Sequence, residues 1–395
     1  APEPVSVARV REALIDERTA LVEYHLGARK GYVWVVDQQE TTLHEVKDPA
    51  AVVGLARRYH GLLSRDRNGL RPPERAALTR DIEEVGRKLS ALVFHPIEKR
   101  VRGKRLLIVA DGALHYVPFA ALPLSTGAPV LVAHELVSLP SASVLDSLRR
   151  DPQPRRVAGG VAVFADPVFS KEDPRVAGRS RPEPAASNKQ TVATPSLPRG
   201  VDGRFERLRF SRREAEAIAA ALGEKAEPAL DFRAAKTALI ERDLSGHRIL
   251  HFATHGVLNT DHPELSGLVF SLVDPSGAPV DGFLRLHEIY NLDLNADLVV
   301  LSACRTALGK EVRGEGLIGL TRGFMYAGAS RVVSTVWNVD DRASAVLMAR
   351  FYEAMKSKRA TPASALREAQ LSLLREARWA SPHYWAAFGL QGEWK

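Results

Sequence analysis

The feature that most constrains this chain is an alternation of short apolar runs with longer segments of helical periodicity, from about residue 159 onward. The runs are rich in β-branched residues, as in "RILHFAT", "DLVVLSA" and "RVVSTVW". Between them lie segments such as "SRREAEAIAAALG" and "DRASAVLMARFYEAMKS", which repeat apolar residues at helical spacing. Strands that alternate with helices build mostly parallel sheets with helices on both faces. The sequence therefore predicts an α/β fold whose chemistry lies at the carboxyl ends of the strands.

The part of the chain before this region predicts a first α/β lobe. Residues 20–46 alternate apolar and polar side chains around Gly27 and Gly31, which is typical of a β-hairpin. A helix is expected over residues 71–92, and "KRLLIVADGALHYVPFAAL" predicts a strand, a turn and a short returning strand.

We expect the chain to divide into two parts, an N-terminal lobe over residues 1–152 and a second domain over residues 153–395. Residues 167–204 are rich in Pro, Ser, Gly and Arg and show no periodicity, which predicts an exposed loop in the second domain. Further on, we expect helices over residues 234–244 and 316–328 and a hairpin over residues 269–283.

Composition narrows the class of protein. The chain holds one cysteine in 395 residues, so an internal disulfide is impossible and a reducing compartment is favoured. No apolar run approaches the roughly 20 residues of a membrane span, and the start of the sequence lacks signal-peptide features. We therefore expect a cytoplasmic protein that binds no membrane. The formal charge is +8, and basic and acidic residues are mixed along the chain without a basic stripe. This pattern argues against a nucleic-acid partner.

Two reactive side chains stand where two predicted strands end. His255 ends the run "RILHFATH", and Cys304 ends "DLVVLSAC", 49 residues later. A histidine about 50 residues before a cysteine is the arrangement in caspases. Imidazole can convert a thiol to the nucleophilic thiolate, and the backbone N–H groups of Gly256 and Cys304 could hold an oxyanion.

Other interpretations of these residues remain open at this point. Cys304 could be a small buried hydrophobe, and His255 could have a capping or core role. His251 is interpreted as a packed core histidine. A zinc site formed by His251, His255 and His262 is disfavoured, because the segment is a strand and lacks the glutamate of the helical motif. The pattern "GEGLIG" over residues 314–319 is a weak nucleotide-binding match, because the preceding strand ends too far upstream.

These residues resemble the CHAT domain family, caspase-like modules often attached to tetratricopeptide repeats. The resemblance rests on "HFATHG", "LSACRTALG", "GEGLIGLTRGFMYAGASRVVSTVWNVDD", "FYEAM", "ALREAQ" and "HYWAAFGLQG", and in the front half on "ADGALHYVPFAAL" and "LPSASVL". It implies a caspase-like sandwich related to separase, preceded by a pseudo-caspase lobe without its own catalytic residues. It also implies that His255 is the general acid/base and Cys304 the nucleophile of a cysteine endopeptidase that needs no metal or other cofactor.

The segment "STVWNVDDRAS" resembles the separase segment that carries an acid for a basic P1 side chain. Asp341 aligns best with that acid, and Asp340 and Trp337 are further candidates for the S1 pocket. A carboxylate facing Arg or Lys predicts cleavage after a basic residue. Either aspartate could instead cap the following helix. Arginines in "GRSR", "LPRG" and "FERLRFSRRE" suggest self-cleavage as a hypothesis.

Two classes of function follow from the resemblance. The first is an endopeptidase acting on a protein or peptide substrate, regulated by a tetratricopeptide-repeat protein or another partner, or by processing. The second is a catalytically silent interaction or scaffold module with the same fold. Retention of both His255 and Cys304 in full motifs favours the endopeptidase.

Overall fold

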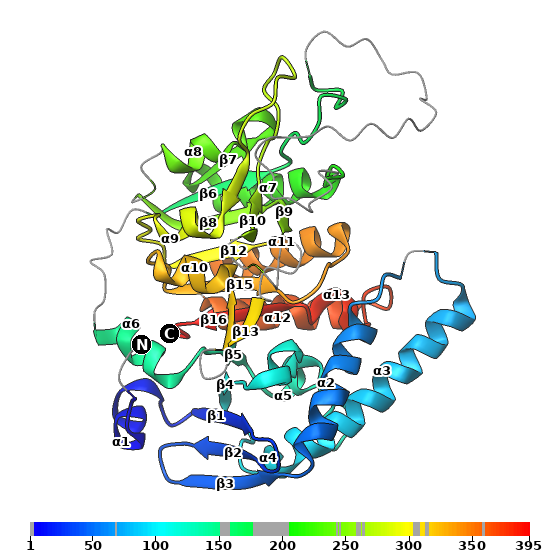
Figure 1. Cartoon of the computed structure of the whole chain (residues 1–395), viewed down its shortest axis with the longest axis vertical. Coiled ribbons are helices and arrows are strands. Elements are labelled where there is room, and N and C mark those ends of the chain that lie inside the picture. The colour runs from blue at the N-terminus through cyan, green and yellow to red at the C-terminus, as the bar shows by residue number, and fades with distance from the viewer. Residues whose placement is uncertain are drawn as a thin grey trace.

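The computed structural model describes residues 4–67, 69–150, 159–176, 205–241, 244, 246–257, 262, 265–302, 309–312, 316–357 and 360–395. These residues form one eleven-stranded sheet, seen as a stack of strands along the long axis in Figure 1. Its spatial order is β3 (Thr41–Val46), β2 (Gly31–Val36), β1 (Thr19–Leu26), β4 (Arg105–Val109), β5 (Leu136–Ser138), β16 (Phe388–Gly392), β15 (Arg331–Thr335), β12 (Leu298–Leu301), β8 (His247–Ala253), β6 (Gly160–Ala165) and β7 (Ala226–Leu230).

The front half of the sheet begins with the hairpin expected from residues 20–46. Strands β1, β2 and β3 are antiparallel neighbours, and β1 pairs with β4 in parallel. Inward-facing Val33 and Val35 are buried, which matches the alternation in the sequence. Two long helices, α2 (Pro49–Leu63) and α3 (Pro72–Val93), pack against each other beside this half (Figure 1), so the helix expected over residues 71–92 is confirmed.

The back half is parallel, and its inner strands, β15, β12, β8 and β6, are buried on both faces, whereas the edge strand β7 is partly exposed. On β8, Ile249 packs into the core beneath α7 (Arg209–Leu222), α11 (Asp341–Ser357) and α12 (Pro362–Leu374). The next residue, Leu250, packs into a second core with α9 (Leu286–Tyr290) and α10 (Leu320–Tyr326). This two-sided burial explains the continuous apolar runs in these strands and confirms the predicted α/β class.

Strand β16 joins the two halves. It pairs in parallel with β5 through Gln391 and Ser138, and antiparallel with β15, where Phe388 lies opposite Thr335. Strands β1, β3, β4 and β5 therefore run opposite to the parallel strands of the back half, whereas β2 runs in the same direction as those strands. One hydrophobic core extends from Val22 of β1 to Val163 of β6. The division of the chain into two domains at residue 152 stays a prediction. The eleven-stranded sheet and the hydrophobic core both include residues from each side of this boundary.

The remaining described elements are short. They are α1 (Val7–Arg9), α4 (His95–Glu98), α5 (Val130–Ala133), α6 (Ala142–Arg150), α8 (Lys236–Ile240), α13 (Pro382–Trp385), β9 (His255–Val257), β10 (Gly267–Val269), β11 (Phe283–Arg285), β13 (Gly309–Val312) and β14 (Gly316–Gly319). Strands β10 and β11 confirm the hairpin expected over residues 269–283, because they pair antiparallel at Val269 and Phe283.

Three sequence expectations differ from the structure. The prediction of a returning strand after Asp111 is wrong. Two 3-10 turns, Gly112–Tyr116 and Phe119–Ala121, take its place around Pro118, which has no N–H to donate. The helix expected over residues 316–328 begins only at Leu320, because Gly316–Gly319 pair with β13. The helix expected over residues 234–244 is confined to α8.

The same pairing changes the interpretation of "GEGLIG", since its last four residues form a strand. Of the loop expected over residues 167–204, residues 167–176 hold no helix or strand, and residues 177–204 lie outside the described part of the chain.

Candidate active site at the carboxyl ends of β8 and β12

The two strands expected to carry the reactive residues are adjacent and parallel, with Phe252 of β8 opposite Leu301 of β12. His255 follows β8 closely and begins β9, which pairs with β10. After β12 the described chain reaches Ser302, two residues before Cys304. Cys304 itself, with the oxyanion N–H expected there, lies outside the described residues.

The imidazole of His255 packs against two phenylalanine rings that also contact each other. Its centroid is 5.1 Å from that of Phe169 and 5.3 Å from that of Phe205. Its Nε2 atom lies 2.7 Å from the backbone carbonyl oxygen of Glu206. A carbonyl oxygen only accepts, so Nε2 carries the hydrogen and donates it. In the neutral ring Nδ1 is then the basic nitrogen.

Burial lowers the pKa of the His255 imidazole below its ordinary value, although the Glu206 carbonyl opposes this effect. The neutral ring therefore persists to lower pH than in an exposed histidine. A histidine that is neutral near pH 7 can accept a proton, as a general base must.

A small polar cavity of about 30 Å³ lies near the ends of three parallel strands. It is lined by Thr254 after β8, Ser302 after β12 and Thr335 at the end of β15, together with Ser211, Glu214 and Asp341 from the two helices above them. The Oδ2 atom of Asp341 accepts a hydrogen bond from the backbone N–H of Phe210 at 2.8 Å. Burial raises the pKa of the Asp341 carboxyl to about 6, and the nearby carboxylate of Glu214 adds to this effect.

The neighbouring candidates take other positions. Asp340 caps α11, since its Oδ1 accepts a hydrogen bond from the backbone N–H of Ala343 at 2.8 Å. Asp340 therefore has the cap position, and Asp341 has the cavity position. Trp337 is fully buried, and its Nε1 donates to the carbonyl oxygen of His383 at 3.0 Å. The structure therefore places Trp337 in the core instead of the cavity wall. Gly256 lies in β9 opposite Leu268.

His251 is a core residue, as the sequence predicts. It has no exposed surface, and its Nε2 lies 2.7 Å from Oε1 of Glu214 while Nδ1 lies 3.0 Å from the hydroxyl of Tyr352. Both ring nitrogens thus have protein partners. His251 and His255 point to different surroundings, and the described residues contain no group of three or more potential metal ligands.

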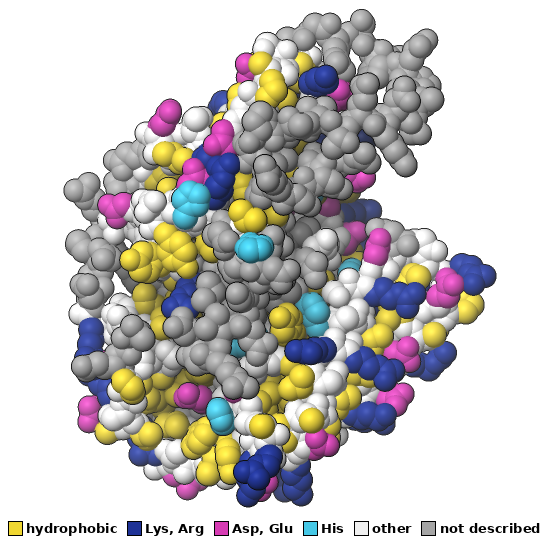
Figure 2. Space-filling model, viewed as in Figure 1, with side chains coloured by type: hydrophobic (Ala, Val, Ile, Leu, Met, Phe, Trp, Pro, Cys, Tyr) yellow, Lys and Arg dark blue, Asp and Glu magenta, His cyan; other side chains and the backbone are white. Residues whose placement is uncertain are grey.

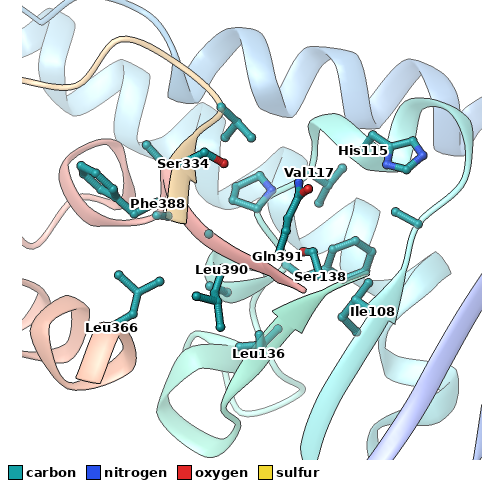
Figure 3. A pocket seen from close by; sticks show the side chains of 18 of the residues that line it. Ile108, His115, Val117, Leu136, Ser138, Ser334, Leu366, Phe388, Leu390 and Gln391 are labelled. Carbon is teal, nitrogen blue, oxygen red and sulfur yellow. The ribbon is translucent and has the colours of Figure 1, made fainter. Parts of the chain in front are cut away.

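A larger cavity, of about 130 Å³, lies at the junction of the two halves of the sheet (Figure 3). Its lining is mostly apolar and includes Ile108, Leu136, Leu366 and Leu390. Neither His255 nor Asp341 lines it, whereas Asp341 and Thr254, the residue before His255, line the smaller cavity. We therefore place the candidate chemistry at the smaller cavity. Phe388 lines both cavities and separates them.

Sequence reasoning missed the residues that surround His255. Glu206 accepts the hydrogen bond through its backbone carbonyl, which any residue type would provide, so residue type does not reveal this hydrogen bond. Phe205 and Phe169 lie in segments without periodicity, and only their aromatic character distinguished them from loop residues. Of the expected self-cleavage segments, residues 205–214 are described and lie against His255 and β6, while the other two lie outside the described part of the chain.

The sequence matches the CHAT domain family over residues 83–393. The chain belongs to this family. Among curated proteins, this CHAT chain is 25% identical over 328 residues to Tetratricopeptide repeat protein 28 of Mus musculus, and 25% identical over 330 residues to that of Homo sapiens. Each match covers 74% of this chain but 12% of the relative's length, so the CHAT chain corresponds to a small part of those proteins.

Among solved structures, the CHAT chain is similar to a chain of the Saccharomyces cerevisiae separase–securin complex. The TM-score is 0.55 at 9% identity, and the match covers 95% of this chain and 30% of that one. This likeness concerns the fold alone. Together with the family match, it shows a caspase-like fold of the clan CD cysteine-peptidase type.

The surface and the helices add two observations. On the face in Figure 2, basic and acidic side chains are interspersed over the described residues, with no block of one sign. No helix among the described residues has the length and apolarity to cross a bilayer.

Proposed function

We propose that this CHAT domain is a cysteine endopeptidase in which His255 activates Cys304. The observation that carries the proposal is the position of His255, at the end of β8, with Nε2 committed to Glu206 and Nδ1 left as the base. The neighbouring strand β12 leads to Ser302, and two further residues span at most about 7 Å, so a thiol at position 304 can reach the same edge of the sheet.

The chemistry follows from these groups. Nδ1 of His255 accepts the thiol proton, and the thiolate attacks the carbonyl carbon of the scissile peptide bond. The negative charge on the carbonyl oxygen is held by the backbone N–H groups of Gly256 and Cys304. The imidazolium then protonates the departing amine, which leaves a thioester on Cys304. Water, deprotonated by the same imidazole, hydrolyses the thioester and restores the thiol. No metal or other cofactor takes part in these steps.

We propose that Asp341 binds a basic P1 side chain. It lies in the cavity between the strand ends, where a carboxylate facing Arg or Lys forms a charge-assisted pair. A cavity of about 30 Å³ is small for a P1 side chain, so we expect it to widen when a substrate binds. Control by a protein partner would suit such a pocket. The relatives named for tetratricopeptide repeats, and the separase solved with securin, support a partner of this kind.

The experiment that tests the proposal compares the wild-type protein with Cys304→Ala on a peptide library varied at P1. We expect the wild type to cleave after Arg or Lys and the variant to lose this cleavage by about 10³-fold or more. Thermal unfolding of both proteins controls for folding. Equal turnover by the two proteins would reject Cys304 as the nucleophile. No cleavage of any peptide by a folded wild type, with or without a partner, would favour the scaffold function.

For the S1 pocket we expect Asp341→Asn to lower kcat/KM for basic P1 residues by about 10²-fold, because a buried charge would lose its partner. Since the pKa of Asp341 is about 6, its carboxylate is charged above that pH, and wild-type kcat/KM for an Arg peptide should fall between pH 7 and pH 5. Asp340→Asn is the matched control, and it should keep the P1 preference while it weakens the cap of α11. An unchanged Arg preference in Asp341→Asn would exclude Asp341 from the pocket.

A further inference from the structure

The segment that contacts His255 also contacts the cavity of Asp341. Phe205 packs against the imidazole, and the Glu206 carbonyl accepts its Nε2–H. Four residues later, the N–H of Phe210 donates to Asp341. We call residues 205–210 the bridge segment, because both candidate groups of the active site depend on it.

One side chain of the bridge segment is tied firmly to the sheet. Arg207 donates to both carboxylate oxygens of Asp166, from Nε at 2.8 Å and from NH2 at 2.7 Å. Asp166 has no exposed surface and follows directly after β6, the strand beside β8. A bidentate pair with a buried carboxylate holds its partners in one geometry.

The carboxylate of Asp166 is held in turn by other groups. Nε of Arg212 donates to its Oδ2 at 2.8 Å, and NH1 of Arg175 lies 3.1 Å from its Oδ1. Both arginines also pair with Asp231, and Arg175 pairs with Asp173. The cluster thus balances three carboxylates against three guanidinium groups, so the buried charge of Asp166 is compensated.

Peptide geometry links this cluster to the histidine. The carbonyl of Glu206 and the backbone N–H of Arg207 belong to one planar peptide unit, which moves as a rigid body. A side chain that anchors residue 207 to β6 therefore limits where the Glu206 oxygen can point. That oxygen is the acceptor which fixes the hydrogen of His255 on Nε2.

We infer that Asp166 and Arg207 are positioning residues for the general base: their ion pair aims the Glu206 carbonyl at His255 and thereby keeps Nδ1 free to accept the proton of Cys304. The catalytic part of this inference rests on the proposed function. The structural part, in which Arg207 controls the tautomer of His255, is independent of the proposed function. The backbone oxygen of Glu206 is the acceptor in this arrangement, and the exposed carboxylate of its side chain acts on the imidazole only through its charge.

The test is nitrogen-15 NMR of histidine-labelled protein above pH 8, where a neutral imidazole shows one pyrrole-type and one pyridine-type nitrogen. His255→Asn assigns the signals. We expect the wild type to show His255 with its hydrogen on Nε2 alone, and Arg207→Met to show exchange between the two tautomers. Arg207→Lys, which keeps one charged contact, should restore most of the wild-type spectrum. Arg209→Met, an exposed arginine of the same segment, is the matched control and should match the wild type.

Activity separates this inference from the proposed function. In an active wild type, Arg207→Met should lower kcat by about 10²-fold with little change in KM, since a displaced base slows the chemical step. An unchanged tautomer in folded Arg207→Met overturns the inference, whether or not the wild type cleaves peptides. A changed tautomer in a protein without peptidase activity supports the structural link and overturns the proposed function alone.

Discussion

The His255→Asn variant is expected to cleave peptides at least about 10³-fold more slowly than the wild-type protein. Asparagine has no nitrogen that accepts a proton near neutral pH, and its amide lies too close to the backbone to replace Nε2 as the donor to the Glu206 carbonyl. The thiol of Cys304 would then lose its base, and the departing amine would lose its acid. Steady-state kinetics on a peptide cleaved by the wild type measures this loss.

A second measurement separates chemistry from folding in this variant. Alkylation of the single cysteine by iodoacetamide reports the thiolate, and we expect His255→Asn to react more slowly than the wild type near pH 7. His287→Asn, which changes an exposed histidine of α9, should match the wild type in both assays. A His255→Asn protein with wild-type kcat/KM would show that another group is the base.

The second large effect concerns stability. Trp337→Ala should lower the free energy of unfolding by about 3–5 kcal/mol, because it removes a fully buried indole and leaves the carbonyl of His383 without its donor. The indole also packs edge-on against the ring of His60 on α2, with 5.9 Å between the centroids and 66° between the ring planes. This contact lies between the two halves of the protein.

Denaturant titration followed by fluorescence or circular dichroism measures this change. Tyr326→Ala is the control, since the Tyr326 side chain is exposed and its loss should change stability by about 0.5 kcal/mol or less. A Trp337→Ala protein of normal stability but altered P1 preference would return Trp337 to the S1 pocket, as the sequence expectation had it.

The sequence predicts the strands of the candidate active site because their signal is local. The β-branched runs before His255 and Cys304 form the adjacent strands β8 and β12, and each run is long and apolar because both faces are buried. His251 could be assigned to the core for the same reason. Asp340 and Asp341 could not be separated, since either can cap a helix and only the packing of α7 decides which one faces the cavity.

The parts that the sequence does not predict depend on contacts between distant segments. Glu206 and His255 are 49 positions apart, and the hydrogen bond between them uses the backbone oxygen of Glu206. Every residue type has this oxygen, so the sequence does not reveal the hydrogen bond. The periodicity also does not predict that β16 lies between β5 and β15, because an apolar run specifies a strand but not the strands that pair with it. The 3-10 turns after Asp111 have a local cause instead. Pro118 lacks a backbone N–H, so this apolar segment does not form the predicted strand.

The central position of β16 has a consequence for synthesis on the ribosome. The edges of β5 and β15 stay open until residues 388–392 emerge, 250 residues after Ser138. At about 5–20 residues per second, the edge of β5 stays unpaired on this side for roughly 10–50 s, whereas the edge of β15 appears only with residues 331–335. Open edges can recruit a strand from another molecule. Neighbouring nascent chains could thus exchange their β16 strands, and shielding by chaperones during this interval would decide how much monomer forms.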